Sequence, residues 1–261
     1  MKEHKLYLGL EKGVALVTAG SRGIGRAIAH RLATEGMTVV AASRSVSEPE
    51  IVGDGRIESW AHDLGDSDAT GQLVQKVVDE FGRLDVVVLN TPGPRILPVL
   101  DTNWSDWQLA HDLLLRPVVQ LGNAAGAVMR GQGEGSIILL SSTWVRQPAP
   151  GGVLSASYRS AASAYVKALA SELAPIGVRV NQVMPGATGT DRMQGILEMK
   201  SANNGTTIEE EVAKVVKDVP LGRWAEATEI ADSVAFLASP RASFITGTSL
   251  VIDGGAVRAA H

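Results

Sequence analysis

Short runs of hydrophobic residues, rich in valine and isoleucine, recur from the beginning of the chain to its end. Within most of these runs the apolar residues follow one another directly, whereas they would alternate with polar residues in a strand that has one solvated face. Continuous apolar runs are typical of parallel strands covered by helices on both faces. The pattern predicts seven strands, at Val14–Thr18, Thr38–Ala42, Arg56–Trp60, Asp85–Leu89, Ser136–Leu140, Arg179–Val183 and Ser249–Ile252.

The segments between these strands have the spacing of apolar residues that is typical of amphipathic helices. The predicted helices are Arg22–Glu35, Asp66–Phe81, Trp104–Met129, Ala156–Ala174 and Ala227–Leu237. Strands and helices alternate without a Pro/Ser-rich linker, a repeat or a low-complexity segment. We therefore predict a single domain over residues 1–261 with a Rossmann-like, doubly wound α/β fold, in which about seven parallel strands have helices on both faces.

Residues 186–217 are the least regular part of the chain, and the polar segment 201–207 in their middle is typical of a mobile loop. Loops of this length are usually functional lids or disordered segments. We expect residues 186–217 to form a lid over a substrate pocket that is built from the C-terminal half of the chain.

The composition excludes several classes of protein. Hydrophobic residues make up 45% of the 261 residues and charged residues 20%, which is enough apolar surface for a large core and argues against disorder. Lys and Arg number 24 against 28 Asp and Glu, and the net charge of −4 gives no indication of a nucleic-acid or anionic-lipid partner. The chain has no cysteine, which excludes disulfides, thiolate nucleophiles and cysteine-ligated metals. We expect no metal site.

No apolar run approaches the ~18 residues of a membrane span. The apolar stretch 6–10 is also too short for the core of a signal peptide. We expect a soluble, cytoplasmic protein that acts on a small molecule and has no membrane partner.

A glycine-rich segment lies between the first predicted strand and the first predicted helix. Its sequence is Ala19-Gly20-Ser21-Arg22-Gly23-Ile24-Gly25. Glycines at such a junction let the backbone approach a pyrophosphate, which the free N–H groups and the dipole of the helix N-terminus attract. The alternative is a tight strand-to-helix turn without a ligand.

This segment resembles the first turn of the short-chain dehydrogenase/reductase (SDR) family, T-G-x-x-x-G-I-G. Thr18, Gly23, Ile24 and Gly25 match that pattern, but Ala19 replaces its first glycine. Other matches extend over nearly the whole chain and end with Pro220–Arg223, Phe236–Ser239, Ile245–Gly247 and Asp253–Gly255. The resemblance implies a Rossmann-like fold and a nicotinamide nucleotide as cofactor.

The resemblance also assigns residues beyond the glycine turn to that nucleotide. Two follow the third predicted strand and would hold the adenine, one ends the fourth strand, and four belong to a segment similar to the family's N-x-x-x-P-G. The threonines of that segment would meet the nicotinamide carboxamide or the phosphates. These residues are Asp63, Leu64, Asn90, Pro185, Gly186, Thr188 and Thr190.

The end of the second predicted strand indicates which nucleotide is bound. An NAD site usually has Asp or Glu there, where the carboxylate accepts hydrogen bonds from the ribose hydroxyls. This chain has Ser43, followed by Arg44, and Arg22 lies in the first turn. Two arginines without a carboxylate attract a 2′-phosphate, so we expect NADP(H), with NAD also possible. The alternative is that both arginines are solvated surface charges.

The catalytic positions depart from the family pattern. Family members use a serine, a tyrosine thirteen residues later and a lysine four residues beyond, with an asparagine on the preceding helix. Here Ser142 occupies the serine position, while Ser155, Arg159 and Leu114 replace the tyrosine, lysine and asparagine. No Tyr-x-x-x-Lys pair occurs anywhere in the chain, so the sequence resembles a divergent branch of the family.

These replacements change what the site can do. A phenol has a pKa near ~10 that a cation can lower, whereas the hydroxyl of Ser155 is a far weaker acid. Arg159 stays protonated and cannot relay protons, although its donors can hold ribose hydroxyls. Tyr158, His111 and water remain alternatives as the proton source, but a packing role is the simpler interpretation of both side chains.

We expect an NADP(H)-dependent oxidoreductase that reduces a carbonyl group or an activated C=C bond by hydride transfer. Two alternatives are a non-redox catalyst, such as a cyclase or isomerase, that retains the nucleotide, and a nucleotide-binding protein without turnover. The family resemblance further implies a homo-oligomer, a tetramer or a dimer, with interfaces on the two long predicted helices and the C-terminal segment.

Overall fold

The computed structural model describes residues 8–259, so part of the short apolar stretch 6–10 lies outside the described residues. One large sheet has the strand order β10-β7-β6-β5-β1-β2-β4-β3. Its members are β1 (Val14–Thr18), β2 (Thr38–Ser43), β3 (Glu50–Val52), β4 (Gly55–Ala61), β5 (Val86–Leu89), β6 (Gly135–Leu140), β7 (Val178–Pro185) and β10 (Ser249–Ile252). All neighbouring pairs are parallel except β3 and β4.

The seven predicted strands are all present, and the doubly wound α/β fold is confirmed. The sheet has the seven parallel strands that were expected, and β3 adds a short antiparallel strand at its edge. Its three residues, Glu50–Val52, are too few to give a recognisable hydrophobic pattern. A second, two-stranded sheet pairs β8 (Thr188–Gly189) with β9 (Ala225–Glu226).

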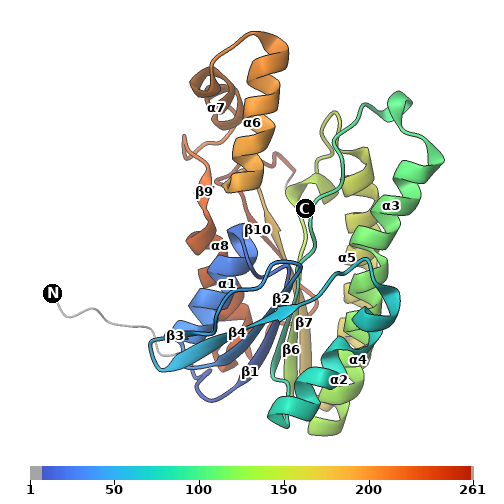
Figure 1. Cartoon of the computed structure of the whole chain (residues 1–261), viewed down its shortest axis with the longest axis vertical. Helices are drawn as coiled ribbons and strands as arrows, with labels where there is room; N and C mark the ends of the chain where they lie inside the picture. Colours follow the sequence, from blue (N-terminus) through green and yellow to red (C-terminus); the bar gives the residue numbers. More distant parts are fainter. Residues whose placement is uncertain (1–7, 260–261) are drawn as a thin grey trace, which may run out of the picture.

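Helices cover both faces of the large sheet (Figure 1). The α-helices are α1 (Gly23–Thr34), α2 (Ser67–Phe81), α3 (Trp104–Leu114), α4 (Arg116–Gln132), α5 (Val153–Leu173), α6 (Asp191–Asn204), α7 (Ile208–Val216) and α8 (Ala227–Ala238). Four single-turn 3-10 helices complete the list, η1 (Val99–Asp101), η2 (Thr143–Val145), η3 (Ala174–Ile176) and η4 (Pro240–Ala242). None of the helices in residues 8–259 is both long and apolar enough to cross a bilayer.

Alternate residues of each central strand face opposite sides of the sheet and belong to two separate cores. Ala15 and Val17 of β1 pack with α1 and α8, and Leu16, between them, packs with α2, α4 and α5. All three side chains are fully buried. Because both faces are covered, four of the five residues of β1 are apolar, and the polar one, Thr18, is buried at the carboxyl end with its hydroxyl donating to the Asn90 carbonyl.

The single helix expected at Trp104–Met129 is two helices, α3 and α4. The boundary falls at Leu115, whose N–H still donates to the His111 carbonyl and whose carbonyl still accepts from the Val119 N–H, both at 3.0 Å, and Pro117 lies in the first turn of α4. Proline has no N–H to donate, and its ring clashes with the carbonyl four residues earlier, so a helix breaks immediately before it. The apolar spacing on both sides concealed this break.

The prediction of a loop within residues 186–217 is also wrong, because this region forms the helices α6 and α7. Thr190 caps α6, and Gly205, with φ of +64°, ends it. Thr207 then begins α7 through a capping box with Glu210. Within the polar segment 201–207, residues 201–204 therefore belong to α6, Gly205 ends that helix and Thr207 caps α7. Both helices lie beyond the carboxyl ends of the strands (Figure 1).

Candidate active site

The glycine turn lies between β1 and α1, at the carboxyl end of the sheet. α1 begins at Gly23, its N-cap residue is Arg22, and no side chain caps the helix or places an acidic group in its first turn. Ala19, which replaces the first glycine of the family pattern, has a φ of +47°, and Gly23 has a φ of +51°. Ala19 therefore adopts the left-handed conformation that the family glycine would favour. An uncapped N-terminus of this kind can bind an anion.

Two glycines of the turn lie against backbone atoms. A Cβ atom on Gly25 would be 2.3 Å from the carbonyl oxygen of Ala19 and 2.7 Å from Nδ2 of Asn90, and one on Gly20 would be 2.9 Å from a carbonyl oxygen. Asn90 Nδ2 donates to the Ala19 carbonyl at 3.3 Å, and Thr18 Oγ1 donates to the Asn90 carbonyl at 2.6 Å. Asn90 thus joins the end of β5 to the turn, and the close packing leaves the backbone accessible to a diphosphate.

The end of β2 carries the groups expected to select the nucleotide. Ser43 is buried, and its hydroxyl donates to the Ser45 carbonyl at 2.6 Å. Arg22 Nη2 donates to Ser45 Oγ at 3.3 Å, and both Arg22 and Arg44 are exposed. Within residues 8–259 neither arginine forms a salt bridge. Both positive charges remain available for a phosphate.

The residues expected at the adenine follow β4. Asp63 Oδ1 accepts a hydrogen bond from the N–H of Gly65 at 2.9 Å, which fixes the turn before α2. Leu64 is buried in the core on the α2 side of the sheet. The structure therefore gives both residues a role in the local fold, and the adenine contact stays a prediction.

The segment after β7 is tightly built. Pro185 pairs with Ile252 of β10, and a Cβ on Gly186 would lie 2.7 Å from the Cβ of Asp253. Thr188 is buried and donates to the Gly186 carbonyl at 3.2 Å. These contacts position the start of α6 next to the glycine turn.

Ser142 follows β6 and is the N-cap residue of η2. Its Oγ accepts a hydrogen bond from the N–H of Trp144 at 3.2 Å. This contact uses a lone pair of the oxygen and leaves the hydroxyl proton free to donate elsewhere. Ser142 can therefore act as a hydrogen-bond donor at the carboxyl end of the sheet.

Ser155 and Arg159 lie one turn apart on α5, and Nε of Arg159 donates to Oγ of Ser155 at 3.3 Å. Nη1 of Arg159 donates to the carbonyl of Leu140 at 2.8 Å, two residues before Ser142. Burial, with a smaller contribution from the charge of Arg192, lowers the pKa of Arg159 to about 10. Arg159 still carries its charge at neutral pH, and Leu114 at the asparagine position is buried and apolar.

Tyr158 and His111 were the other two candidate proton donors. His111 belongs to α3, and Tyr158 of α5 packs against that helix. The ring of Tyr158 lies edge-on to Trp107 and to His111, with ring centroids 5.9 Å apart in both cases. Burial and the charge of Asp112 raise the pKa of Tyr158, and His111 Nδ1 lies 3.0 Å from Asp112 Oδ1. These contacts favour a packing role and make Tyr158 a weaker acid than a free phenol.

One charged residue was missed by the sequence analysis. Arg192, in the first turn of α6, donates from Nη1 to the carbonyl of Gly93 and from Nη2 to that of Pro94, both at 3.0 Å. Thr190, its N-cap neighbour, lies 3.4 Å from the position of a Cβ on Gly23. The family pattern assigns no role to position 192. Arg192 becomes visible only in the structure, where α6 approaches the loop after β5.

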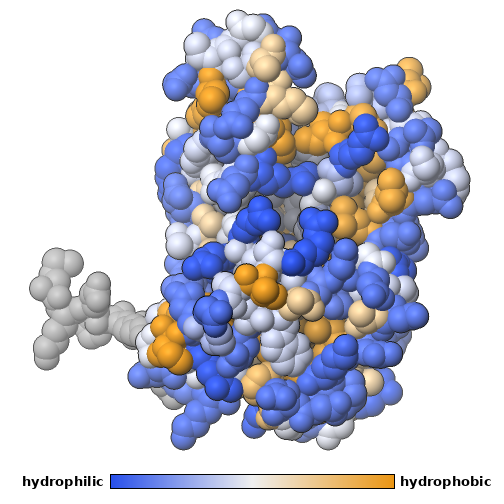
Figure 2. Space-filling view, viewed as in Figure 1, coloured by the Kyte–Doolittle hydropathy of each residue, from blue (hydrophilic) through white to orange (hydrophobic). Residues whose placement is uncertain are grey.

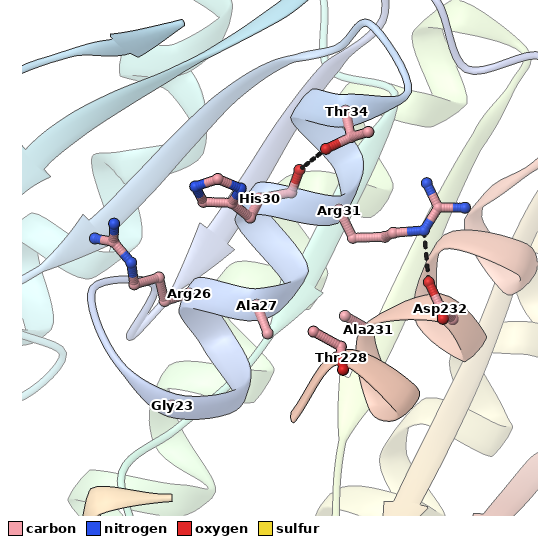
Figure 3. Close-up of a pocket in the computed structure, with 9 residues that line it drawn as sticks. All are labelled: Gly23, Arg26, Ala27, His30, Arg31, Thr34, Thr228, Ala231 and Asp232. Carbon is pink, nitrogen blue, oxygen red and sulfur yellow. Dashed lines mark hydrogen bonds and ion pairs between the residues drawn. The ribbon is translucent and has the colours of Figure 1, made fainter. Parts of the chain in front are cut away.

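A separate cavity of about 430 Å³ lies between α1 and α8 (Figure 3). It is lined by Gly23, Arg26, Ala27, His30, Arg31, Thr34, Thr228, Ala231 and Asp232. Arg31 Nε donates to Asp232 Oδ1 at 2.6 Å across it. None of Ser142, Ser155 and Arg159 lines this cavity, so it is distinct from the candidate catalytic positions. Figure 2 shows a notch in the surface between the α6–α7 pair and α3.

Comparison with known proteins gives matches over most of the chain. Residues 18–257 match a family model described as enoyl-(acyl carrier protein) reductase. The chain is 32% identical over 251 residues to the short-chain reductase protein NovJ of Streptomyces niveus, covering 94% of each chain. It is also 32% identical over 252 residues to a 3-oxoacyl-[acyl-carrier-protein] reductase of Synechocystis, covering 94% of this chain and 96% of the other.

Solved structures show the same fold. The L-sorbose reductase of Gluconobacter frateurii, complexed with NADPH and L-sorbose, superposes with a TM-score of 0.90 at 27% identity and covers 97% of this chain and 100% of its own. YwfH, an NADPH-dependent reductase involved in bacilysin biosynthesis, gives a TM-score of 0.87 at 26% identity, with coverage of 95% and 100%. The sequence match over most of the chain, together with this fold, shows that the protein belongs to the short-chain dehydrogenase/reductase family of NAD(P)-dependent oxidoreductases.

Proposed function

We propose that this chain is an NADPH-dependent reductase that acts on a carbonyl group or an activated C=C bond, with Ser142 donating to the oxygen on which negative charge develops. The observation that carries the proposal is the geometry of Ser142. Its Oγ accepts a hydrogen bond from the Trp144 N–H, so its own proton remains available to donate. Arg159 is anchored nearby, at the carbonyl of Leu140, two residues before Ser142 in the chain. A positioned donor of this kind stabilises a developing oxyanion.

The residues around the glycine turn fit the nucleotide. The uncapped N-terminus of α1 and the close-packed Gly20 and Gly25 form a cradle for a diphosphate, and Arg22 and Arg44 are free to meet a 2′-phosphate. NADPH, when bound, supplies the hydride. In this proposal Arg159 takes over the ribose-binding role of the family lysine. Asp63 and Leu64 lie at the adenine, and residues 186–217 cover a substrate pocket formed by the C-terminal half.

The replaced catalytic residues bear on the type of substrate. Neither Ser155 nor Arg159 is a proton donor at neutral pH, since a serine hydroxyl is too weak an acid and Arg159 keeps its charge with a pKa of about 10. Reduction of an activated C=C bond produces an enolate, which the Ser142 hydroxyl can stabilise while water provides the proton. This chemistry favours an enone-type substrate over a simple ketone.

Nucleotide titrations test the cofactor assignment. NADPH is expected to bind about ten- to a hundred-fold more tightly than NADH, because a charge-assisted contact contributes roughly 1.5–3 kcal/mol. Ser43→Asp is expected to reverse the preference, since a carboxylate repels the 2′-phosphate. Ser47→Asp places the same charge at an exposed position beyond the end of β2 and serves as the control. Equal affinities for the two nucleotides in the wild type would overturn the assignment.

Turnover assays test the reaction class. Paired enones and saturated ketones are incubated with the protein and NADPH, and the absorbance of NADPH is followed together with product formation. Substrate-dependent loss of NADPH supports the reductase. A product formed without loss of NADPH indicates a non-redox catalyst, and tight NADPH binding without any product indicates a nucleotide-binding protein.

A further inference from the structure

The α6–α7 pair is attached to the rest of the molecule by few buried contacts. Across residues 191–216, all of which the structure describes, only Leu197 of α6 and Glu211 of α7 are buried. The side-chain hydrogen bonds that Glu211 accepts all come from within the pair, so they join the two helices to each other. Little buried surface therefore holds the pair to the sheet, and a segment of this kind opens locally at a low cost in free energy.

The chain enters and leaves this region through a fixed neck. β8 precedes the pair and β9 follows it, and the two strands pair Thr188 with Ala225 and Gly189 with Glu226. The small sheet therefore closes the base of the segment that carries both helices. A movement of the α6–α7 pair relative to the large sheet would pivot on this neck.

One side chain joins the pair to the body of the protein. Arg192 donates from Nη1 to the carbonyl of Gly93 and from Nη2 to that of Pro94, both at 3.0 Å. Among the described residues, no other hydrogen bond or salt bridge links residues 191–216 to the chain before residue 190 or after residue 219. The polar attachment of the pair beyond its own neck thus depends on Arg192.

The β5 loop, residues 90–98, is shaped to receive this guanidinium. A Cβ atom on Gly93 would lie 2.2 Å from Cζ of Arg192, so the absence of a side chain at this glycine makes room for the arginine. The loop is fixed at both sides of this point, because Asn90 bonds the glycine turn and Arg95 Nη1 donates to the buried Asp106 of α3 at 3.0 Å. Arg192 therefore holds the α6–α7 pair to a braced part of the candidate site.

We propose that Arg192 is a latch, a positioning residue whose two hydrogen bonds to the β5 loop keep the α6–α7 pair closed over the candidate site. The pair opens when these bonds break, and NADPH leaves through the opening. The inference rests on the proposed function for the presence of the nucleotide. Thr190, the N-cap residue of α6, lies 3.4 Å from the position of a Cβ on Gly23, so the pair begins directly beside the glycine turn.

Two variants remove the latch from opposite sides. Arg192→Ala deletes both donors and keeps a residue that favours a helix. Gly93→Ala displaces the guanidinium without changing the arginine, and the φ angle of Gly93 is not positive, so its backbone accepts alanine. In the nucleotide-free protein both variants are expected to exchange the amide hydrogens of residues 191–216 at least about ten-fold faster than the wild type, since hydrogen bonds from a charged donor shift an opening equilibrium by such a factor. The double variant should exchange no faster than either single one, because both changes break the same contact.

Stopped-flow fluorescence measures the release of NADPH from the loaded protein. Arg192→Ala and Gly93→Ala are expected to release it about ten-fold faster than the wild type, and Arg192→Lys, which keeps the charge without the planar fork, should give an intermediate rate. Lys200→Ala removes a positive charge from an exposed position on α6 and is the control for the arginine variants. Gly195→Ala is the control for the glycine variant, since nothing lies within 4 Å of its added methyl group on α6. Neither control should accelerate exchange or release.

Exchange of residues 191–216 at the wild-type rate in both Arg192→Ala and Gly93→Ala would overturn the latch. Acceleration that extends equally over the central strands would also overturn it, because that result indicates a loss of global stability. Faster exchange with unchanged release of NADPH would overturn the role of the latch in gating. A wild type that binds no NADPH would instead overturn the proposed function, and the exchange comparison without nucleotide would still decide whether Arg192 holds the pair.

Discussion

Gly25 lies where the first turn of α1 approaches the ends of β1 and β5. A single methyl group there would overlap the Ala19 carbonyl at 2.3 Å and the Asn90 amide at 2.7 Å. The carbonyl is part of the backbone and cannot rotate away, and the amide is needed to hold the end of β5. The position therefore accepts only glycine for reasons that are independent of any ligand.

Gly25→Ala is expected to lower the melting temperature by several degrees and to abolish NADPH binding, because relieving the overlap moves the turn. Overpacking of this kind costs about 1–3 kcal/mol. Calorimetric melting and nucleotide titration measure the two effects. Gly131→Ala is the control, since nothing lies within 4 Å of its added methyl group on α4, and helix propensity favours Ala there by roughly 0.5–1 kcal/mol. Equal melting temperatures for the two variants would contradict the packing argument.

The two serines at the candidate catalytic positions are expected to differ in importance. Ser142→Ala removes the donor to the developing negative charge and should reduce turnover by about 10–1000-fold. Ser155→Ala should be mild, because Arg159 keeps its bond to the Leu140 carbonyl. Steady-state kinetics distinguish the two variants. They are measured with NADPH and with the enone that gives the highest turnover in the wild type. Loss of activity in Ser155→Ala with Ser142→Ala unaffected would overturn the assignment.

At the scale of elements, α6 and α7 are joined through one buried carboxylate. Glu211 Oε1 accepts hydrogen bonds from Lys214 at 2.6 Å, Thr206 at 2.7 Å and Asn204 at 3.1 Å. The bond to Lys214, followed by those to Thr206 and Asn204, lowers the pKa of Glu211 to about 2. This cluster ties the turn between the two helices, and Leu197 anchors α6 below it.

Glu211→Gln is expected to loosen the α6–α7 pair, seen as faster hydrogen exchange of the amides in residues 191–216. A depressed carboxyl pKa stabilises the fold above the unfolded value of about 4.5, and this stabilisation is lost as the pH falls towards 2. The exchange difference between wild type and variant should therefore be full at pH 6 and shrink below pH 4.5. The exposed Glu209→Gln on the same helix is the control, and a difference that stays constant down to pH 3 would contradict this role of Glu211.

At the scale of the whole molecule, several large apolar side chains remain exposed. Leu100 is 96% exposed and Trp104 72%, both near the start of α3, and Phe244 after η4 is fully exposed. Exposed groups of this kind often mark protein contacts. The homo-oligomer stays a prediction, and these side chains are candidates for its contacts.

Light scattering at micromolar concentration is expected to give at least twice the chain mass of 27.4 kDa. Ala164→Arg places a bulky charge on the exposed side of α5, one of the predicted interface helices, and should dissociate the assembly. Ala202→Arg makes the same change on α6, away from that helix, and should leave the mass unchanged. A wild-type mass of about 27 kDa would refute the oligomer.

The sequence alone determined the features that depend on residues close to one another along the chain. Runs rich in apolar residues indicated every long strand, and the bounds of β1 and β10 agree with the prediction to the residue. The signal is clearest in β1, which is buried at every position and has four apolar residues out of five. The glycine turn was equally visible, since its glycines are required by the backbone path itself. The local pattern failed near Pro117. The apolar spacing continues there from α3 into α4, so the boundary between the two helices was not predicted.

Only the tertiary structure decided how distant segments meet. The edge strand β3 exists because it pairs with β4, and the polar residues around Thr207 cap helices that pack beyond the sheet. Nothing in the spacing of residues indicates that Arg192 reaches the carbonyl of Gly93, or that Tyr158 packs against α3. Such contacts join residues far apart in the chain, and their partners are selected by the packing of whole elements, which periodicity along the chain does not encode.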